Sequence, residues 1–203
     1  MGLVHGVKEK VHLPLYDSLF IPGGKNGGGK TLVQCMNDPR LMRFFVDVQG
    51  KTKLETNMQA SGVLPSSNSF ETRAMRVVVS SPTFRGEAVQ ESDRIAELIY
   101  SSVTSLIVGE KVMIEMPTYY FPGGAGVSPG FPHVTNHGEP DPTATFRFAE
   151  PVMIEKQQNF RVEILFPQGV PGQEADPPDR LAGLKGPMHI WVVLDGYLTR
   201  DVQ

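Results

Sequence analysis

Residues 145–167 read TFRFAEPVMIEKQQNFRVEILFP, and most of the apolar side chains there occupy every second position. Successive side chains of a β-strand point to opposite faces, so this period predicts two strands with one buried face, separated by a polar turn at residues 156–159. Pro151 has no N–H for a ladder and belongs at a sheet edge or a bulge. The turn lacks Asn-Gly and Asp-Gly, so a tight two-residue hairpin is not indicated. This pattern predicts an antiparallel β domain.

The rest of the chain also consists of short apolar segments separated by turn signals. Its 203 residues include 21 Gly and 17 Pro, about a fifth of the total, which favours many turns over long helices. The β-branched run at residues 75–79 is typical of a strand in the middle of a sheet. Further strands are expected at residues 15–21, 31–36, 41–48, 70–80, 104–108, 111–116, 189–195 and 197–202.

One helix is expected, at residues 92–102. Ile95, Leu98 and Ile99 are spaced by three and four residues, so they share one face. Ser92 would cap the helix at its N-terminus. We expect the apolar face to pack over one end of a sheet.

Two long stretches dense in proline and glycine, residues 117–142 and 167–187, are expected to be loops. Loops of this length in a compact domain are usually functional or part of an interface. We therefore predict an all-β fold: a single jelly roll or antiparallel β-sandwich over residues 1–203, with one short helix and long loops. Residues 1–12 would form an N-terminal extension.

Composition excludes some classes of function. A net charge of −3, without a basic patch interleaved with aromatic residues, argues against binding nucleic acid. The single cysteine, Cys35, excludes an internal disulfide framework and fits a reducing compartment. No signal peptide or membrane span is expected, because no run approaches about 18 apolar residues. Cys35 and Trp191 are both expected to be buried in the core.

Residues 24–31, GKNGGGKT, match the phosphate-binding pattern G-x-x-x-x-G-K-[ST]. In that role Lys30 would contact the terminal phosphates and Thr31 a magnesium ion. The pattern requires a full helix after the loop and a parallel sheet. Asp38 and Pro39 would stop a helix within about two turns of the loop. A structural glycine loop is the preferred interpretation, and a nucleotide hydrolase remains an alternative.

Residues 126–130, GVSPG, match the nucleophile-elbow pattern G-x-S-x-G around Ser128. In an elbow the residue after the serine donates its backbone N–H to the oxyanion hole. Here that residue is Pro129, which has no N–H. Hydrolase chemistry is therefore disfavoured.

His133 and His137, with Glu139 and Asp141 nearby, are candidate metal ligands. A metal site needs three or four converging donors, and a proline-rich loop places polar residues together without one. Solvated loop side chains are the preferred interpretation. We assign no catalytic, cofactor-binding or metal-binding residues, and we expect a protein that is not an enzyme.

Several short segments, in this order along the chain, resemble the jelly-roll major capsid proteins of tailless icosahedral bacteriophages. The segments are Thr56-Asn57-Met58, Gly62, Leu64-Pro65, Ser69-Phe70, Phe121-Pro122-Gly123-Gly124-Ala125-Gly126, Glu150-Pro151-Val152-Met153-Ile154, Leu194-Asp195-Gly196 and Arg200-Asp201-Val202-Gln203. The resemblance covers most of the chain, from about residue 15 to residue 203. It rests on the order of these segments, none of which is diagnostic alone.

The resemblance implies a viral structural protein that self-assembles into an icosahedral shell. Its partners would be copies of itself in a large symmetric assembly, other virion proteins, and an inner membrane or internal protein layer. Its location would be the virion, made in the host cytoplasm, with no sequence-specific contact to nucleic acid and no cofactor. The long loops would reach neighbouring subunits.

Two other kinds of protein remain open. One is a different virion component, such as a spike, decoration or neck protein. The other is a jelly-roll module that binds carbohydrate or another small ligand, which would need exposed aromatic side chains at its site. The loop candidates for that site are Tyr119, Tyr120, Phe121 and Phe131.

Overall fold

The computed structural model describes residues 8–23, 29–80, 89–123, 125–126, 139–140 and 144–201. Its strands are β1 (Lys8–His12), β2 (Leu15–Ile21), β3 (Leu41–Phe44), β4 (Ser69–Ser80), β5 (Val103–Val108), β6 (Lys111–Pro117), β7 (Ala125–Gly126), β8 (Glu139–Pro140), β9 (Arg147–Ile154), β10 (Phe160–Leu165) and β11 (Met188–Asp201). Its helices are α1 (Leu32–Cys35), α2 (Val89–Tyr100) and the 3-10 turn η2 (Thr118–Tyr120).

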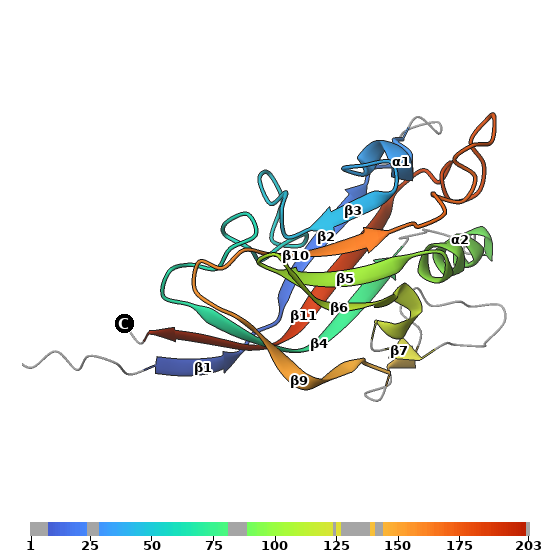
Figure 1. The fold of residues 1–203 in the computed structure, drawn as a ribbon. Coiled ribbons are helices and arrows are strands. Elements are labelled where there is room, and N and C mark those ends of the chain that lie inside the picture. The colour runs from blue at the N-terminus through green and yellow to red at the C-terminus, as the bar shows by residue number, and fades with distance from the viewer. Residues whose placement is uncertain are drawn as a thin grey trace, which may run out of the picture.

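Two antiparallel sheets pack face to face (Figure 1). The first sheet has the order β1-β11-β4-β9, with β2 also paired to β11. The second sheet has the order β3-β10-β5-β6. The chain passes repeatedly between the sheets, so that β2-β11-β4-β9 faces β3-β10-β5-β6, which is the strand order of a jelly roll. The predicted all-β fold is confirmed.

The two strands predicted from residues 145–167 are β9 and β10, and they belong to different sheets. Their inward side chains alternate along each strand as expected and are buried: Val152, Ile154, Phe160, Val162 and Ile164. Residues 155–159 therefore cross from one sheet to the other. Pro151 lies in β9, which is the edge strand of the first sheet, as its missing N–H requires.

The core lies between the sheets and is rich in aromatic residues. The largest fully buried side chains come from both sheets and from the loops between them: Phe44, Phe45, Phe70, Phe121, Phe160 and Phe166. The β-branched run in β4 is central, because it pairs with β11 on one side and donates backbone N–H groups to the Phe146 and Phe121 carbonyls on the other. Leu98 of α2 is buried against this core, so the helix packs where its apolar face predicts.

The strand expected at residues 31–36 is wrong, because this segment forms the one-turn helix α1. Thr31 caps it: its Oγ1 accepts the Gln34 N–H at 3.4 Å, and the Gln34 side chain accepts the Thr31 N–H at 3.0 Å. This reciprocal pair is a capping box, which stabilises the first turn of a helix. The described part of the chain therefore contains a short helix, α1, at a place where the sequence pattern predicted a strand.

Three predicted boundaries also differ from the structure. The strand expected at residues 41–48 is shorter. It ends at Phe44 as β3, because Phe45 has a φ of 69° and cannot continue a strand. The helix α2 begins at Val89, so Ser92 lies inside it and is not its cap. The two strands expected after residue 188 are one strand, β11, with a bulge in its pairing to β4 at Asp195 and Gly196.

Candidate functional site

The outer face of the first sheet carries a hollow of about 340 Å³. Its lining, here called the apolar hollow, consists of Tyr16, Lys53, Leu54, Val78, Trp191 and Val193. Trp191 and Val193 point outward because Ile190, Val192 and Leu194, which alternate with them along β11, fill the core. The expectation that Trp191 is a core residue is therefore wrong. Leu54 stands at the rim with 69% of its surface exposed.

The segment that carries Leu54, residues 51–57, is fastened along the edge of β2. Asn57 donates its backbone N–H to the Tyr16 carbonyl at 3.3 Å, and its Oδ1 accepts the Tyr16 N–H at 2.9 Å. Its Nδ2 also donates to the Pro14 carbonyl at 2.8 Å. The Thr56 hydroxyl donates to the same Tyr16 carbonyl at 3.1 Å. Asn57 thus makes hydrogen bonds of the kind that a neighbouring strand would make, and it covers part of the edge of β2.

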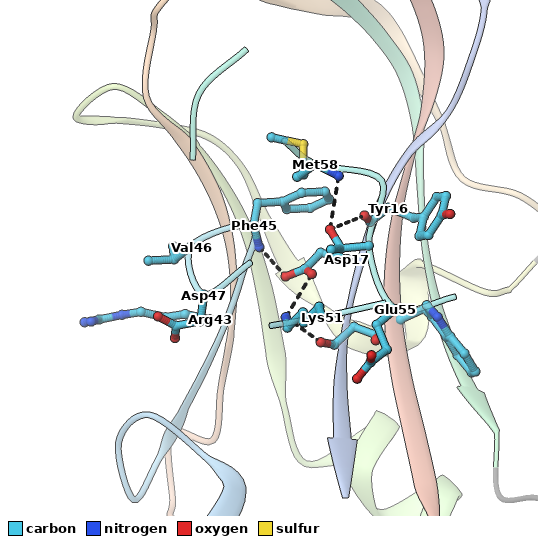
Figure 2. Close-up of polar contacts among 12 residues, drawn as sticks. Tyr16, Asp17, Arg43, Phe45, Val46, Asp47, Lys51, Glu55 and Met58 are labelled. Atoms are coloured by element: carbon cyan, nitrogen blue, oxygen red, sulfur yellow. Dashed lines mark hydrogen bonds and ion pairs between the residues drawn. The ribbon is translucent and has the colours of Figure 1, made fainter. Parts of the chain in front are cut away.

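A buried ion pair fixes the other end of this segment (Figure 2). Asp17 of β2 is fully buried, and its Oδ1 lies 2.8 Å from Nζ of Lys51. Its Oδ2 accepts the Phe45 N–H at 2.6 Å, directly after β3. Lys51 also donates to the Ser18 carbonyl at 2.7 Å. Asp17 therefore links the two sheets and the segment in one place, and its charge is fully compensated.

Two side chains of the hollow hold the rim in position. The indole N–H of Trp191 donates to the Leu54 carbonyl at 3.1 Å. The Tyr16 hydroxyl donates to the Lys53 carbonyl. Because both polar ends are bound to backbone, the rings present their apolar bodies to the hollow. The arrangement is a preformed apolar surface, with no acid–base pair at its centre.

An aromatic row continues from the hollow toward the end of β2. The His189 ring stacks between Phe20, with centroids 4.3 Å apart, and Trp191, with centroids 4.6 Å apart. Burial in this stack lowers the pKa of His189 below its ordinary value of 6.5, and the charge of Glu55 opposes the shift. His189 is therefore neutral near pH 7 and packs as a flat ring.

The depressed pKa of His189 makes stability depend on pH. The unfolded chain takes up a proton at its ordinary pKa of 6.5, and the folded chain resists this until the pH is lower. Stability should therefore fall as the pH drops from about 6.5 toward the folded pKa. Urea unfolding at pH 7.5 and pH 5.5 should show a larger loss for the wild type than for His189→Phe. Equal losses in both proteins would contradict the stacked, neutral His189.

The aromatic candidates in the loop after β6 separate into two groups. Tyr119 and Tyr120 are each 47% exposed, whereas Phe121 is buried in the core. Tyr119 stacks on Tyr120, with centroids 4.8 Å apart, and on Tyr100, which sequence reasoning did not single out, at 5.8 Å. Phe131 lies outside the described residues. The structure thus brings three exposed tyrosines together at the end of α2.

The phosphate-loop candidates are not in the context that the pattern requires. Residues 24–28 lie outside the described part of the chain. The Thr31 hydroxyl caps α1, which has only four residues, and the preceding strand β2 lies in an antiparallel sheet. A phosphate loop needs a full helix and a parallel sheet at this point. The structural interpretation of the glycine loop is therefore favoured.

The remaining candidates are scattered or undescribed. Ser128, His133, His137 and Asp141 lie outside the described residues, and Glu139 is described only as part of β8. Within the described ranges, no three His, Cys, Asp or Glu side chains gather as metal ligands would. Cys35 is half-buried, and burial raises the pKa of its thiol. No helix in this part of the chain is long and apolar enough to cross a membrane.

Comparison of the chain with protein-family models and with curated proteins finds no match.

The apolar hollow is the feature that the sequence analysis did not predict. The available signal was Leu54 itself, a lone large apolar residue in the polar turn GKTKLETN at residues 50–57.

Proposed function

We propose that this chain is a viral structural protein, a subunit that self-assembles into the icosahedral shell of a tailless bacteriophage. The observation that carries the proposal is the apolar hollow on the outer face of the jelly roll. A solvent-facing sheet normally presents polar side chains, so an apolar hollow on this face is a candidate contact for a neighbouring chain. Here one hydrogen bond joins the Trp191 indole to the Leu54 backbone carbonyl, so the indole ring and the backbone of the rim are in position before a neighbour binds.

Exposed apolar side chains on two sheet edges support the same proposal. Val112 and Met113 lie on β6, and Met153 lies on β9. Among the described residues, β6 and β9 each pair with a single neighbouring strand. Open edges bearing large apolar residues favour association with another chain. A closed symmetric assembly would use such surfaces once in every subunit.

The two ends of the described chain pair with each other at one edge of the first sheet. The strand β1 pairs with the last part of β11, from Tyr197 to Asp201, and Figure 1 shows this ladder extending from the sandwich. No residue of β1 is buried. An ion pair between Arg200 and Glu9 joins the two strands of this ladder, and an ion pair between Lys10 and Glu71 connects β1 to β4. The segment expected as an N-terminal extension thus includes an ordered strand with one side unused by the described residues.

The proposed place of action is the virion, after synthesis in the host cytoplasm. The partners would be further copies of the chain, other virion proteins, and an inner membrane or internal protein layer beneath the shell. The net charge of −3 supports a role without binding of nucleic acid through bulk electrostatics. A spike, decoration or neck protein would have the same fold, and the copy number in purified particles separates these roles.

Replacing Leu54 with aspartate should break the proposed contact. A bound neighbour would take this carboxylate out of water at the rim of the hollow, which should weaken association by more than about tenfold. Leu54 is exposed in the single chain, so folding should be unaffected. Sedimentation velocity should show large assemblies for the wild type and for the control Leu54→Met, and small species for Leu54→Asp. If Leu54→Asp assembled as the wild type does, the hollow would not be part of the interface.

A ligand-binding jelly-roll module is the second candidate. The three exposed tyrosines at the end of α2 favour it, because ligand sites often present rigid aromatic rings beside a cavity. A protein that stays monomeric at high concentration, while binding a small ligand there, would support this module over the shell subunit.

A further inference from the structure

A large cavity opens at the end of the sandwich where α2 ends, away from the apolar hollow. Its volume is about 890 Å³, within the range of small-molecule sites. It lies between the end of α2, the turn η2 and the loop that follows β10, and Figure 1 shows this loop and α2 at the same end of the molecule. The side chains that matter for recognition are Arg40, Tyr100, Tyr119, Gln168, Gln173 and Glu174.

One wall of the cavity is an aromatic platform. Tyr100 is 74% exposed, and its ring stacks on Tyr119 at an interplanar angle of 30°. Tyr120 continues the stack from outside the cavity. Exposed tyrosine rings that support one another present a flat apolar face at low entropic cost, with a hydroxyl at the edge. A ligand with a flat C–H face and a polar rim fits such a wall.

The cavity lining also carries planar polar side chains. Arg40 is exposed and forms no ion pair with any described residue, and Glu174 is likewise exposed and unpaired within the described chain. The Oε1 of Gln173 accepts the Val170 N–H at 3.3 Å, so its amide is oriented by the loop. These groups offer several donors and acceptors, and the loop fixes the angle of the Gln173 amide among them. Because Arg40 and Glu174 have opposite charges, the site has no preference for an anion.

Buried hydrogen bonds hold the residues at and beside the cavity wall in position. The Ser102 hydroxyl lies 2.7 Å from that of Thr118, which lies 2.8 Å from that of Thr104, and all three residues are buried. In the loop, Gly172 has a φ of 83°, and a Cβ there would lie 1.9 Å from the Asp179 carbonyl oxygen. The loop is thus folded tightly on itself, and the site is largely formed before any ligand arrives.

We propose that this cavity binds a neutral carbohydrate, a short oligosaccharide whose pyranose ring stacks on the free face of Tyr100, with Tyr119 behind that ring. Its hydroxyl groups would hydrogen-bond to Arg40, Gln173 and Glu174. Proline-rich peptides also use aromatic grooves, but their recognition rests on apolar ridges and needs few charged groups. The site would serve a shell subunit, as a receptor contact, and a free module equally well. Failure of sugar binding would therefore leave the shell proposal untouched.

Saturation-transfer NMR on the full chain tests the site, with maltotriose, cellotriose and chitotriose as separate probes and decaproline as the competing peptide. At least one sugar should receive saturation, strongest on its ring C–H protons. Tyr100→Ala should weaken that binding about tenfold, since it removes the stacking face, and Tyr119→Ala should weaken it more than about threefold, since it removes the ring that supports Tyr100. The matched control Tyr120→Ala, equally exposed but outside the cavity, should change it less than about threefold.

Three results would overturn the inference. They are no binding of any of the three sugars at millimolar concentration, sugar binding that survives the Tyr100→Ala/Tyr119→Ala double variant, and binding of decaproline in place of the sugars. Because Tyr100 and Tyr119 are both largely exposed, their loss should leave the fold intact. Unfolding curves of the variants check that directly.

Discussion

Replacing Asp17 with alanine should destabilise the folded chain by about 3–5 kcal/mol. The substitution leaves the Lys51 ammonium, only 19% exposed, beside the space that its partner filled. It also leaves the Phe45 N–H without its acceptor inside the core. Urea denaturation followed by the fluorescence of Trp191, the chain's only tryptophan, measures the loss.

The matched control for this prediction is an ion pair on the surface. Lys10 pairs with Glu71, but its side chain is largely exposed. Lys10→Ala should therefore cost less than about 1 kcal/mol, as exposed pairs usually do. If Asp17→Ala and Lys10→Ala had similar small effects, the Asp17 contact would not be the link between the sheets that its geometry indicates.

Replacing Gly196 with alanine should cost about 3 kcal/mol or more. Gly196 faces the bulge between β11 and β4, where Arg73 has no partner in the β11 register. A Cβ at this position would lie 2.0 Å from the Glu71 carbonyl oxygen and 3.1 Å from Cζ of Phe70. Neither atom can move away easily. The Glu71 carbonyl belongs to the backbone of a central strand, and the Phe70 ring is fully buried.

Gly123→Ala is the control for the steric argument. The nearest atom to a Cβ there would be Cγ2 of Val78, at an ordinary 3.4 Å. The alanine should leave stability within about 1 kcal/mol of the wild type, because it also restricts the unfolded chain. Thermal unfolding of both variants separates them. A Gly196→Ala protein as stable as Gly123→Ala would mean that the strands at the bulge can separate without loss.

Period-two alternation predicted the strands well, because it depends only on which face of a sheet is buried. It could not assign partners: β9 and β10 follow one another along the chain, yet they lie in opposite sheets. Pro151 was placed correctly at an edge, because its missing N–H limits it wherever the sheet lies. The error at Trp191 came from treating an apolar run as uniformly buried, when alternation along β11 assigns its ring to the outer face.

The candidate sites were harder to predict from the sequence than the strands were. The apolar hollow combines Leu54 with Trp191, which are separated by 137 positions and joined by one hydrogen bond. Asn57 was noticed only as part of a resemblance, and the structure supplies its physical role at the edge of β2. Tyr119 and Tyr120 were proposed from their loop, whereas Tyr100 joins them only because α2 ends beside η2.

The mass and shape of the purified native protein test the proposed shell function most directly. Light scattering and negative-stain electron microscopy should show closed particles or symmetric rings far larger than the 22.3 kDa chain. Such particles should persist across salt concentrations if the apolar hollow carries the contact, since salt screens charges and not apolar burial. A strict monomer at high concentration, under every salt condition, would contradict the proposal.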